Sequence, residues 1–155
     1  MNLRLPRLNL PFYQFKYGEE KGQPTIFDPN RKKYLLLTPE EWVRQNFIQF
    51  LVNEKNYPAS RIQLETKLQL KSVWKRTDAV VYGKRMQPQA IIECKAPDVK
   101  ISQAAFDQIG VYNSALKVEY LFVTNGKEHY CCRMNYGDKS YEFLDGIPDY
   151  SLLEK

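Results

Sequence analysis

Three neighbouring stretches in the middle of the chain have the hydrophobic patterns of β-strands. In 61–70 almost every second residue is apolar, and the runs 74–82 and 89–96 are short and largely apolar. A period of two is typical of β-strands, and the turn-forming residues at 83–88 connect the last two runs. The pattern predicts three strands that form an antiparallel meander.

Two other stretches repeat their apolar residues at helical spacing. The first, 38–55, begins with Thr38 as a capping residue and Pro39 at the first helical position, and two glutamates follow in its first turn. The second, 102–116, has apolar residues three and four positions apart. Both are predicted to be helices.

The remaining segments predict a single domain over residues 1–155. Residues 1–33 are expected to form an irregular extension, and its dense aromatic residues predict that it packs on the domain. Short strands are predicted at 33–37, 119–124, 128–134 and 140–144. The order of helix, three strands, helix and strands predicts an α/β fold with helices packed against one central mixed sheet.

Composition narrows the class of protein. The chain is 43% hydrophobic and 26% charged, and it has neither an apolar run of about 20 residues nor the features of a signal peptide. Its three cysteines form no disulfide framework and no zinc-binding spacing, which suits a reducing, cytoplasmic setting. The net charge of +5 is weak support for a polyanionic partner, because a slightly basic surface without a special role explains it about equally well.

Polar residues interrupt two of the predicted strands. Glu93 and Lys95 are two positions apart, so they point to the same face of a strand and lie roughly 7 Å apart along it. Asp78 lies inside the preceding strand. A structural salt bridge on a sheet face is one interpretation. The other is a functional site, because burying such groups between apolar neighbours is costly.

Two acids and a lysine on adjoining strands have the chemistry of a metal-dependent phosphodiesterase. Mg²⁺ prefers oxygen ligands, and Asp78, Glu93 and the backbone carbonyl of Cys94 would supply them, with Mn²⁺ as a substitute. A bound metal activates water and offsets charge on the phosphate. Lys95 would orient the attacking water or stabilise developing charge.

These residues also resemble a known family. Asp78, fourteen further residues and then Glu93-Cys94-Lys95 resemble the D…(D/E)-x-K signature of the PD-(D/E)xK nuclease superfamily. The chain is most similar to the N-terminal nuclease domain of type I restriction enzyme R subunits. The similar segments occur in the family's order at 38–45, 76–82, 93–97, 108–113 and 124–126.

The resemblance implies a restriction-endonuclease-like three-layer sandwich and a Mg²⁺-dependent DNA endonuclease, a phosphodiester hydrolase. In the parent enzymes this domain is fused to a DNA-translocating motor, and these 155 residues include none. The domain is therefore expected either to act alone on DNA or to work with other restriction–modification subunits or a helicase motor. A non-catalytic DNA-binding or assembly module on the same fold, and a nuclease for RNA or branched DNA, are the alternatives.

The resemblance also implies roles for individual residues. Asp78 and Glu93 would bind the metal, and Lys95 would be the catalytic lysine. Gln108 and Tyr112 match the family's Q-x-x-x-Y motif and share a helix face, where they would contact a DNA phosphate or position the site; ordinary helix packing is the alternative.

Two further features belong with the site. The family carries a glutamate in the first helix, and Glu40 fits it by its inward face and its spacing to Arg44, with Glu41 as the alternative and plain helix-start charge as a third interpretation. Thr77 stands where the superfamily's proline would be.

Basic residues gather near the predicted strands. Lys75, Arg76 and Lys84 would line a groove for DNA, although a solvated surface explains their positions equally well.

Overall fold

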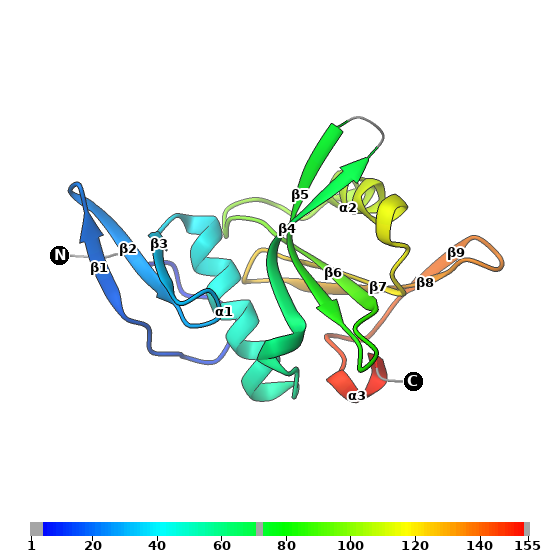
Figure 1. The fold of residues 1–155 in the computed structure, drawn as a ribbon, viewed down its shortest axis with the longest axis horizontal. Coiled ribbons are helices and arrows are strands. Elements are labelled where there is room, and N and C mark those ends of the chain that lie inside the picture. Colours follow the sequence, from blue (N-terminus) through cyan, green and yellow to red (C-terminus); the bar gives the residue numbers. More distant parts are fainter. Residues whose placement is uncertain (1–4, 71–72, 154–155) are drawn as a thin grey trace.

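A computed structural model describes residues 5–70 and 73–153, with the backbone alone described for 66–70, 73–75, 112 and 115. The elements follow one another as shown in Figure 1. They are β1 (Tyr17–Glu20), β2 (Gln23–Asp28), β3 (Lys33–Leu36), α1 (Pro39–Glu54), a 3₁₀ turn (Ala59–Arg61), β4 (Ile62–Leu70), β5 (Val73–Tyr82), β6 (Pro88–Cys94), α2 (Gln103–Leu116), β7 (Tyr120–Thr124), β8 (His129–Asn135), β9 (Ser140–Phe143) and α3 (Tyr150–Leu153).

The central sheet has six strands in the order β4-β5-β6-β7-β8-β9. β4, β5 and β6 form the predicted antiparallel meander. β6 and β7 run parallel and are connected through α2, while β7, β8 and β9 pair antiparallel. The prediction of a mixed sheet is therefore confirmed.

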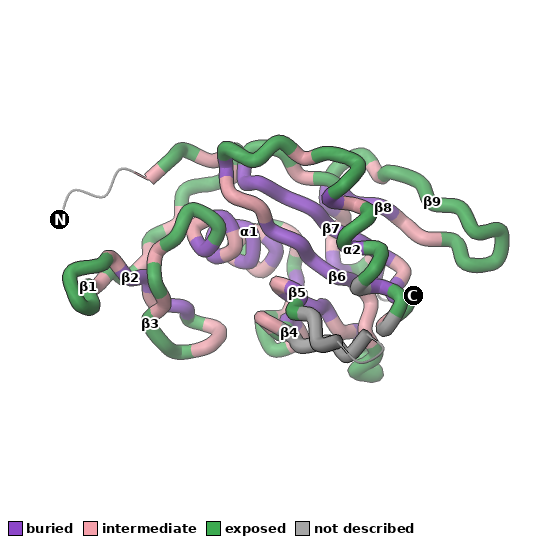
Figure 2. Tube along the Cα trace, turned by 90° about the horizontal axis from the view of Figure 1, so that it is seen from above, coloured by how far each residue is buried: buried purple, intermediate pink, exposed green. Residues whose placement is uncertain are grey.

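The helix α1 covers one face of this sheet. Thr38 accepts a hydrogen bond from the backbone N–H of Glu41, so it caps the helix as predicted. Below the cap, Val43, Phe47 and Leu51 are fully buried against alternate residues of the central strands. Figure 2 shows the buried segments running along α1, β6 and β7.

The helix α2 covers the opposite face. Ala105 and Ile109 pack with Ile91, Leu121 and Val123, which point away from α1 because neighbouring strand residues face opposite sides. The two core clusters give the predicted three-layer α/β sandwich. In the part of the chain that the structure describes, no helix has both the length and the apolar character needed to cross a membrane.

The N-terminal extension is more regular than predicted. β1, β2 and β3 form a separate three-stranded antiparallel sheet, so the expectation of an irregular segment over 1–33 is wrong for 17–33. Turn residues at 21–22 and 29–32 mask the short strands in the sequence. The Trp42 indole donates a 2.9 Å hydrogen bond to the Pro6 carbonyl and Leu8 packs against the α1 core, so residues 6–8 contact the domain.

The turn between β7 and β8 explains one of the motifs in the sequence. Asn125 accepts hydrogen bonds from the backbone N–H groups of Lys127 and Glu128, which fixes the turn. Gly126 has φ +86°, and a Cβ at this position would lie 2.6 Å from Leu8. Only glycine combines this backbone angle with so close an approach of the N-terminal segment.

Candidate active site

The strands β5 and β6 separate from each other in the middle of the sheet. Their pairing runs from Tyr82 to Ala79, where Ala79 lies opposite Ile92, and goes no further. β5 stays paired with β4 as far as Val73. Figure 1 shows β4 and β5 leaving the sheet together as a two-stranded ribbon. The next residues on the separating strands are Asp78 and Glu93.

We call the point where β5 and β6 separate, at Asp78 and Glu93, the fork. Here side chains make hydrogen bonds in place of the interrupted strand pairing. Asp78 Oδ2 accepts a 2.7 Å hydrogen bond from the backbone N–H of Cys94. The fully buried Thr77 donates from its hydroxyl to the Ile92 carbonyl at 3.4 Å. A proline at position 77 could not make this contact, so threonine has a structural role here.

Glu93 and Lys95 share a face, as predicted, and contact each other. Lys95 Nζ lies 3.1 Å from Glu93 Oε1 and donates a second hydrogen bond of 3.1 Å to Gln108 Oε1. Gln108 belongs to α2, so the lysine is held by the helix that covers this face of the sheet. Gln108, expected from the family motif to contact a DNA phosphate or to position the site, thus contacts Lys95 in the structure.

The charges in the fork act on one another. Burial, and then the charge of Asp78, raises the pKa of Glu93 to about 7, against the opposing effect of Lys95. Burial would lower the pKa of Lys95, but the charge of Glu93 and their hydrogen bond outweigh it and raise that pKa. The site therefore holds a charged lysine beside a carboxylate whose negative charge is poorly compensated.

The two glutamates at the start of α1 have different surroundings. The Glu40 side chain is 49% exposed and lies near the fork, where burial and the charge of Asp78 raise its pKa. The sequence analysis placed Glu40 on the inward face of the helix. This placement is wrong, because Glu40 does not lie on the buried face of α1. Glu41 is the buried one, and its carboxylate contacts the guanidinium groups of Arg31 and Arg44. Of the pair, Glu40 faces the candidate site.

Arg44 is the main site residue that sequence reasoning missed. Its guanidinium donates to Asp78 Oδ1 at 2.6 Å and also contacts Glu41 and, at 3.6 Å, Glu40. These charges raise the pKa of Arg44 although its burial acts in the opposite direction. The sequence showed only the helical spacing between Arg44 and Glu40, because the contact with Asp78 spans 34 positions.

Similarity to known proteins identifies the family. The model of the family described as the type I restriction enzyme R protein N terminus (HSDR_N) matches residues 39–148. The chain belongs to this family. The match covers α1, the central sheet and every residue of the fork described above, whereas β1, β2 and β3 precede it.

A solved relative has the same fold. It is a fragment structure described as an HsdR subunit of a type I restriction enzyme from Vibrio vulnificus YJ016, with 18% sequence identity and a TM-score of 0.56. The alignment covers 76% of this chain and 24% of that one, so this chain spans about a quarter of the relative's length. No curated protein matches the sequence.

The fork of this HSDR_N domain suits a hard divalent cation. Within the described residues, three or more His, Cys, Asp or Glu side chains nowhere converge on one metal position. A site would rest on Asp78 and Glu93, with a backbone carbonyl, water and substrate oxygens completing the shell, as is common for Mg²⁺. The raised pKa of Glu93 fits this assignment, because a nearby cation would favour its charged form.

The predicted nucleic-acid residues are only partly brought together. Arg76 is exposed and lies two residues from Asp78 at the start of the ribbon. Lys84 lies in the turn beyond Tyr82, roughly 20 Å along the chain from Asp78 at about 3.3 Å per residue. The side chains of Lys75 and Tyr112 lie outside the described residues.

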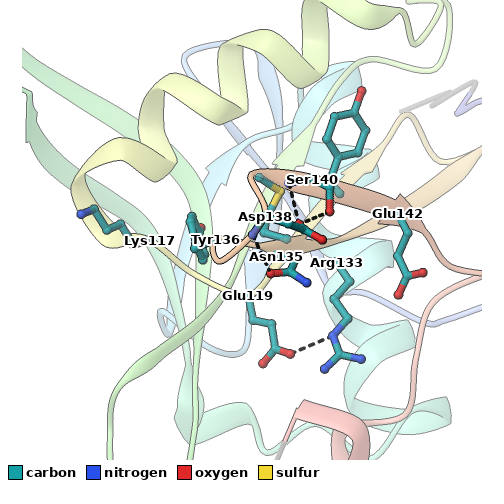
Figure 3. Close-up of a pocket in the computed structure, with 10 residues that line it drawn as sticks. Lys117, Glu119, Arg133, Asn135, Tyr136, Asp138, Ser140 and Glu142 are labelled. Carbon is teal, nitrogen blue, oxygen red and sulfur yellow. Dashed lines mark hydrogen bonds and ion pairs between the residues drawn. The ribbon is translucent and has the colours of Figure 1, made fainter.

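A hollow of about 710 Å³ lies elsewhere, beside the β8–β9 hairpin (Figure 3). Arg133 in its wall donates to Glu119 at 2.9 Å, and Asn135 accepts backbone hydrogen bonds of the hairpin turn. β9 is four strands from β5, roughly 19 Å across the sheet at about 4.8 Å per strand. This hollow is therefore separate from the fork.

Proposed function

We propose that this HSDR_N domain is a Mg²⁺-dependent DNA endonuclease that hydrolyses phosphodiester bonds. The observation that supports the proposal is the fork, where Asp78 and Glu93 adjoin each other and Lys95 is held between Glu93 and Gln108. Membership of the restriction enzyme R family makes a nuclease role the natural reading of this geometry.

The two carboxylates would hold the cation. Asp78 is fixed by Arg44 through one oxygen and by the Cys94 amide through the other, so its orientation is set before a metal binds. Glu93 is less compensated and would gain the most from the added positive charge. The Cys94 carbonyl is directed to the same neighbouring strand as its N–H, because both groups of a strand residue point the same way.

Lys95 would act as a charged hydrogen-bond donor. Its pKa is raised, so at neutral pH it carries a proton and cannot serve as a general base. It would therefore orient the attacking water or stabilise a phosphate oxygen as charge develops. Glu93 and Gln108 fix the Nζ atom in place for this task.

Mg²⁺ or Mn²⁺, when bound, would lower the pKa of a water molecule and offset negative charge at the phosphate. Glu40 borders the fork and would complete its acidic rim. Gln108, Arg76 and the turn residue Lys84 are proposed to contact the DNA backbone. Other restriction–modification subunits or a helicase motor are proposed partners, in keeping with the family.

Cleavage of supercoiled plasmid by the purified chain tests the proposal. Nicking should require Mg²⁺ or Mn²⁺ and stop with EDTA, and Asp78→Asn and Lys95→Met should each lose about 100-fold or more. Asp145→Asn and Lys100→Met, at exposed positions, are the matched controls. Cleavage that survives in both site variants contradicts the proposal. DNA that is bound in a salt-sensitive way but never cut would instead indicate a binding module.

A further inference from the structure

A second set of ion pairs begins in the N-terminal sheet. Arg31 lies in the loop between β2 and β3, and its guanidinium contacts Asp28, Glu41 at 2.7 Å and Glu65 at 2.9 Å. Asp28 also accepts hydrogen bonds from the backbone N–H groups of Asn30, at 2.8 Å, and of Arg31 itself. Asp28 thus fixes both the backbone of the loop and the side chain of Arg31.

The ion pairs continue from Arg31 to the fork. Glu41 binds Arg31 with one carboxylate oxygen and Arg44 with the other. Arg44 in turn donates to Asp78 Oδ1. Asp28, Arg31, Glu41, Arg44 and Asp78 therefore form one continuous row, named here the arginine relay.

The relay is shielded from water. The side chains of Asp28, Glu41 and Asp78 are 2%, 5% and 10% exposed, and those of Arg44 and Arg31 are 11% and 13% exposed. Ion pairs that lie away from solvent are screened little, and removing one member leaves its partner uncompensated. A change at Arg31 should therefore reach Asp78 through Glu41 and Arg44.

The relay also crosses the boundary of the family match. Arg31 and Asp28 precede residue 39, where the match to the HSDR_N family begins. The other three members lie within it. Through this row of ion pairs, the loop between β2 and β3 is connected to the part of the chain that matches the family.

We propose that Arg31 is a positioning residue for the metal-binding carboxylate of Asp78. It holds Glu41, which fixes the guanidinium of Arg44 and so the orientation of Asp78. The N-terminal sheet is then a working part of the site. This inference rests on the proposed function insofar as that function assigns a divalent cation to Asp78 and Glu93.

The geometry requires an arginine at position 31. A guanidinium offers five N–H donors in a rigid fork and can bridge several carboxylates at once. Lysine at this position keeps the charge, but its ammonium is a compact point charge on a flexible stem. Arg31→Lys should consequently position Glu41 less well than arginine does, and better than an uncharged side chain.

Direct measurement of Mn²⁺ binding, by electron paramagnetic resonance of the free ion, tests the proposal without relying on cleavage. Direct hydrogen-bond partners of metal ligands typically contribute about 10–100-fold in affinity. Arg31 acts on Asp78 only through Glu41 and Arg44, so Arg31→Met should weaken Mn²⁺ binding at the lower end of that range, by about 10-fold. Arg31→Lys should fall between Arg31→Met and the wild type. The matched control is Arg133→Met, which removes an arginine and its ion pair with Glu119 far from the fork.

Each outcome bears on the proposal. Circular dichroism shows whether Arg31→Met folds, and if it does not, Arg31→Lys carries the comparison. Arginine variants that bind Mn²⁺ as the wild type does would overturn the proposal, even if they are less stable. A wild-type chain that binds no Mn²⁺ would overturn it as well. A wild type that binds Mn²⁺, shows these differences and yet cuts no DNA would contradict the proposed function alone.

Discussion

Asp78 and Glu93 occupy directly opposed positions on two strands that have just stopped pairing. The register that puts Ala79 opposite Ile92 would put Asp78 opposite Glu93, and the ladder ends there. Two opposed carboxylates repel each other, and the charge of Asp78 contributes to the raised pKa of Glu93. The fork thus places like charges together, which favours a cation between them and disfavours the metal-free state.

Replacing Glu93 should therefore stabilise the metal-free protein. The pKa of Glu93 is about 7 in the folded chain, above its value in an unfolded one. The protonated side chain therefore makes its full contribution to stability at low pH, and this contribution is lost as the pH rises through 7. At pH 8, Glu93→Gln should raise the free energy of unfolding by on the order of 2 kcal/mol.

Chemical denaturation at pH 5 and pH 8, in EDTA, measures this effect. The gain from Glu93→Gln should be larger at pH 8, and the exposed Glu142→Gln should show no such gain. Adding Mg²⁺ should stabilise the wild type and leave Glu93→Gln unchanged. A Glu93→Gln variant that is less stable than the wild type at both pH values would show that ionised Glu93 does not destabilise the metal-free protein.

The two glutamates of α1 should differ in their effect on stability, although both bear on the site, Glu40 directly and Glu41 through Arg44. Glu40→Ala removes a half-exposed side chain at the fork, so unfolding should change by no more than about 0.5 kcal/mol while cleavage falls about 10-fold or more. Glu41→Ala leaves two buried guanidinium groups without their shared carboxylate and should destabilise by about 3 kcal/mol. Denaturation curves and cleavage rates of both variants decide between these roles, and the reverse pattern would assign Glu41 to the site.

Arg76 and Lys84 should differ in their effect on DNA binding. Arg76 adjoins the fork and Lys84 lies in the turn at the far end of β5, so a DNA backbone placed at Asp78 reaches the first more readily. Arg76→Ala should weaken binding and lower the salt-dependence slope by about 1, as expected for one lost phosphate contact. Fluorescence anisotropy over a series of salt concentrations compares it with Lys84→Ala, and a larger effect of Lys84→Ala than of Arg76→Ala would place the DNA away from the fork.

His129 should make the fold sensitive to acid. Its ring stacks on Phe47 and Phe50, Nδ1 lies 2.7 Å from Thr124 Oγ1, and Nε2 lies 3.0 Å from the Asn9 carbonyl. Burial lowers its pKa, so the unfolded chain takes up the proton first and stability falls as the pH drops below about 6.5. Denaturation midpoints between pH 7.5 and 5 should fall less in His129→Phe than in the wild type; parallel curves would contradict this.

Much of the fold could be predicted because it depends on local patterns. Period-two alternation predicted β4, the short apolar run at 74–82 predicted β5, and Thr38-Pro39 marked the start of α1. β1 and β2 escaped prediction because turn residues surround them and interrupt any period-two pattern. The short helix α3 likewise has too few residues for a periodic pattern.

The candidate site divides in the same way. Strand alternation placed Glu93 and Lys95 on one face, and the apolar neighbours of Asp78 marked it as unusual. The contacts of Arg44 with Asp78 and of Arg31 with Glu41 connect distant elements, so no local spacing reveals them. The choice between Glu40 and Glu41 likewise depends on a contact outside the helix, because Arg31 pairs with Glu41.

The central claim is that Asp78 and Glu93 hold one divalent cation between them. Anomalous diffraction from crystals soaked in Mn²⁺ tests this most directly. The account predicts a single strong peak at the fork, with an oxygen of each carboxylate within about 2.3 Å of the ion, and loss of that peak in Asp78→Asn. A peak bound to other residues, or no peak at the fork at millimolar Mn²⁺, would contradict it.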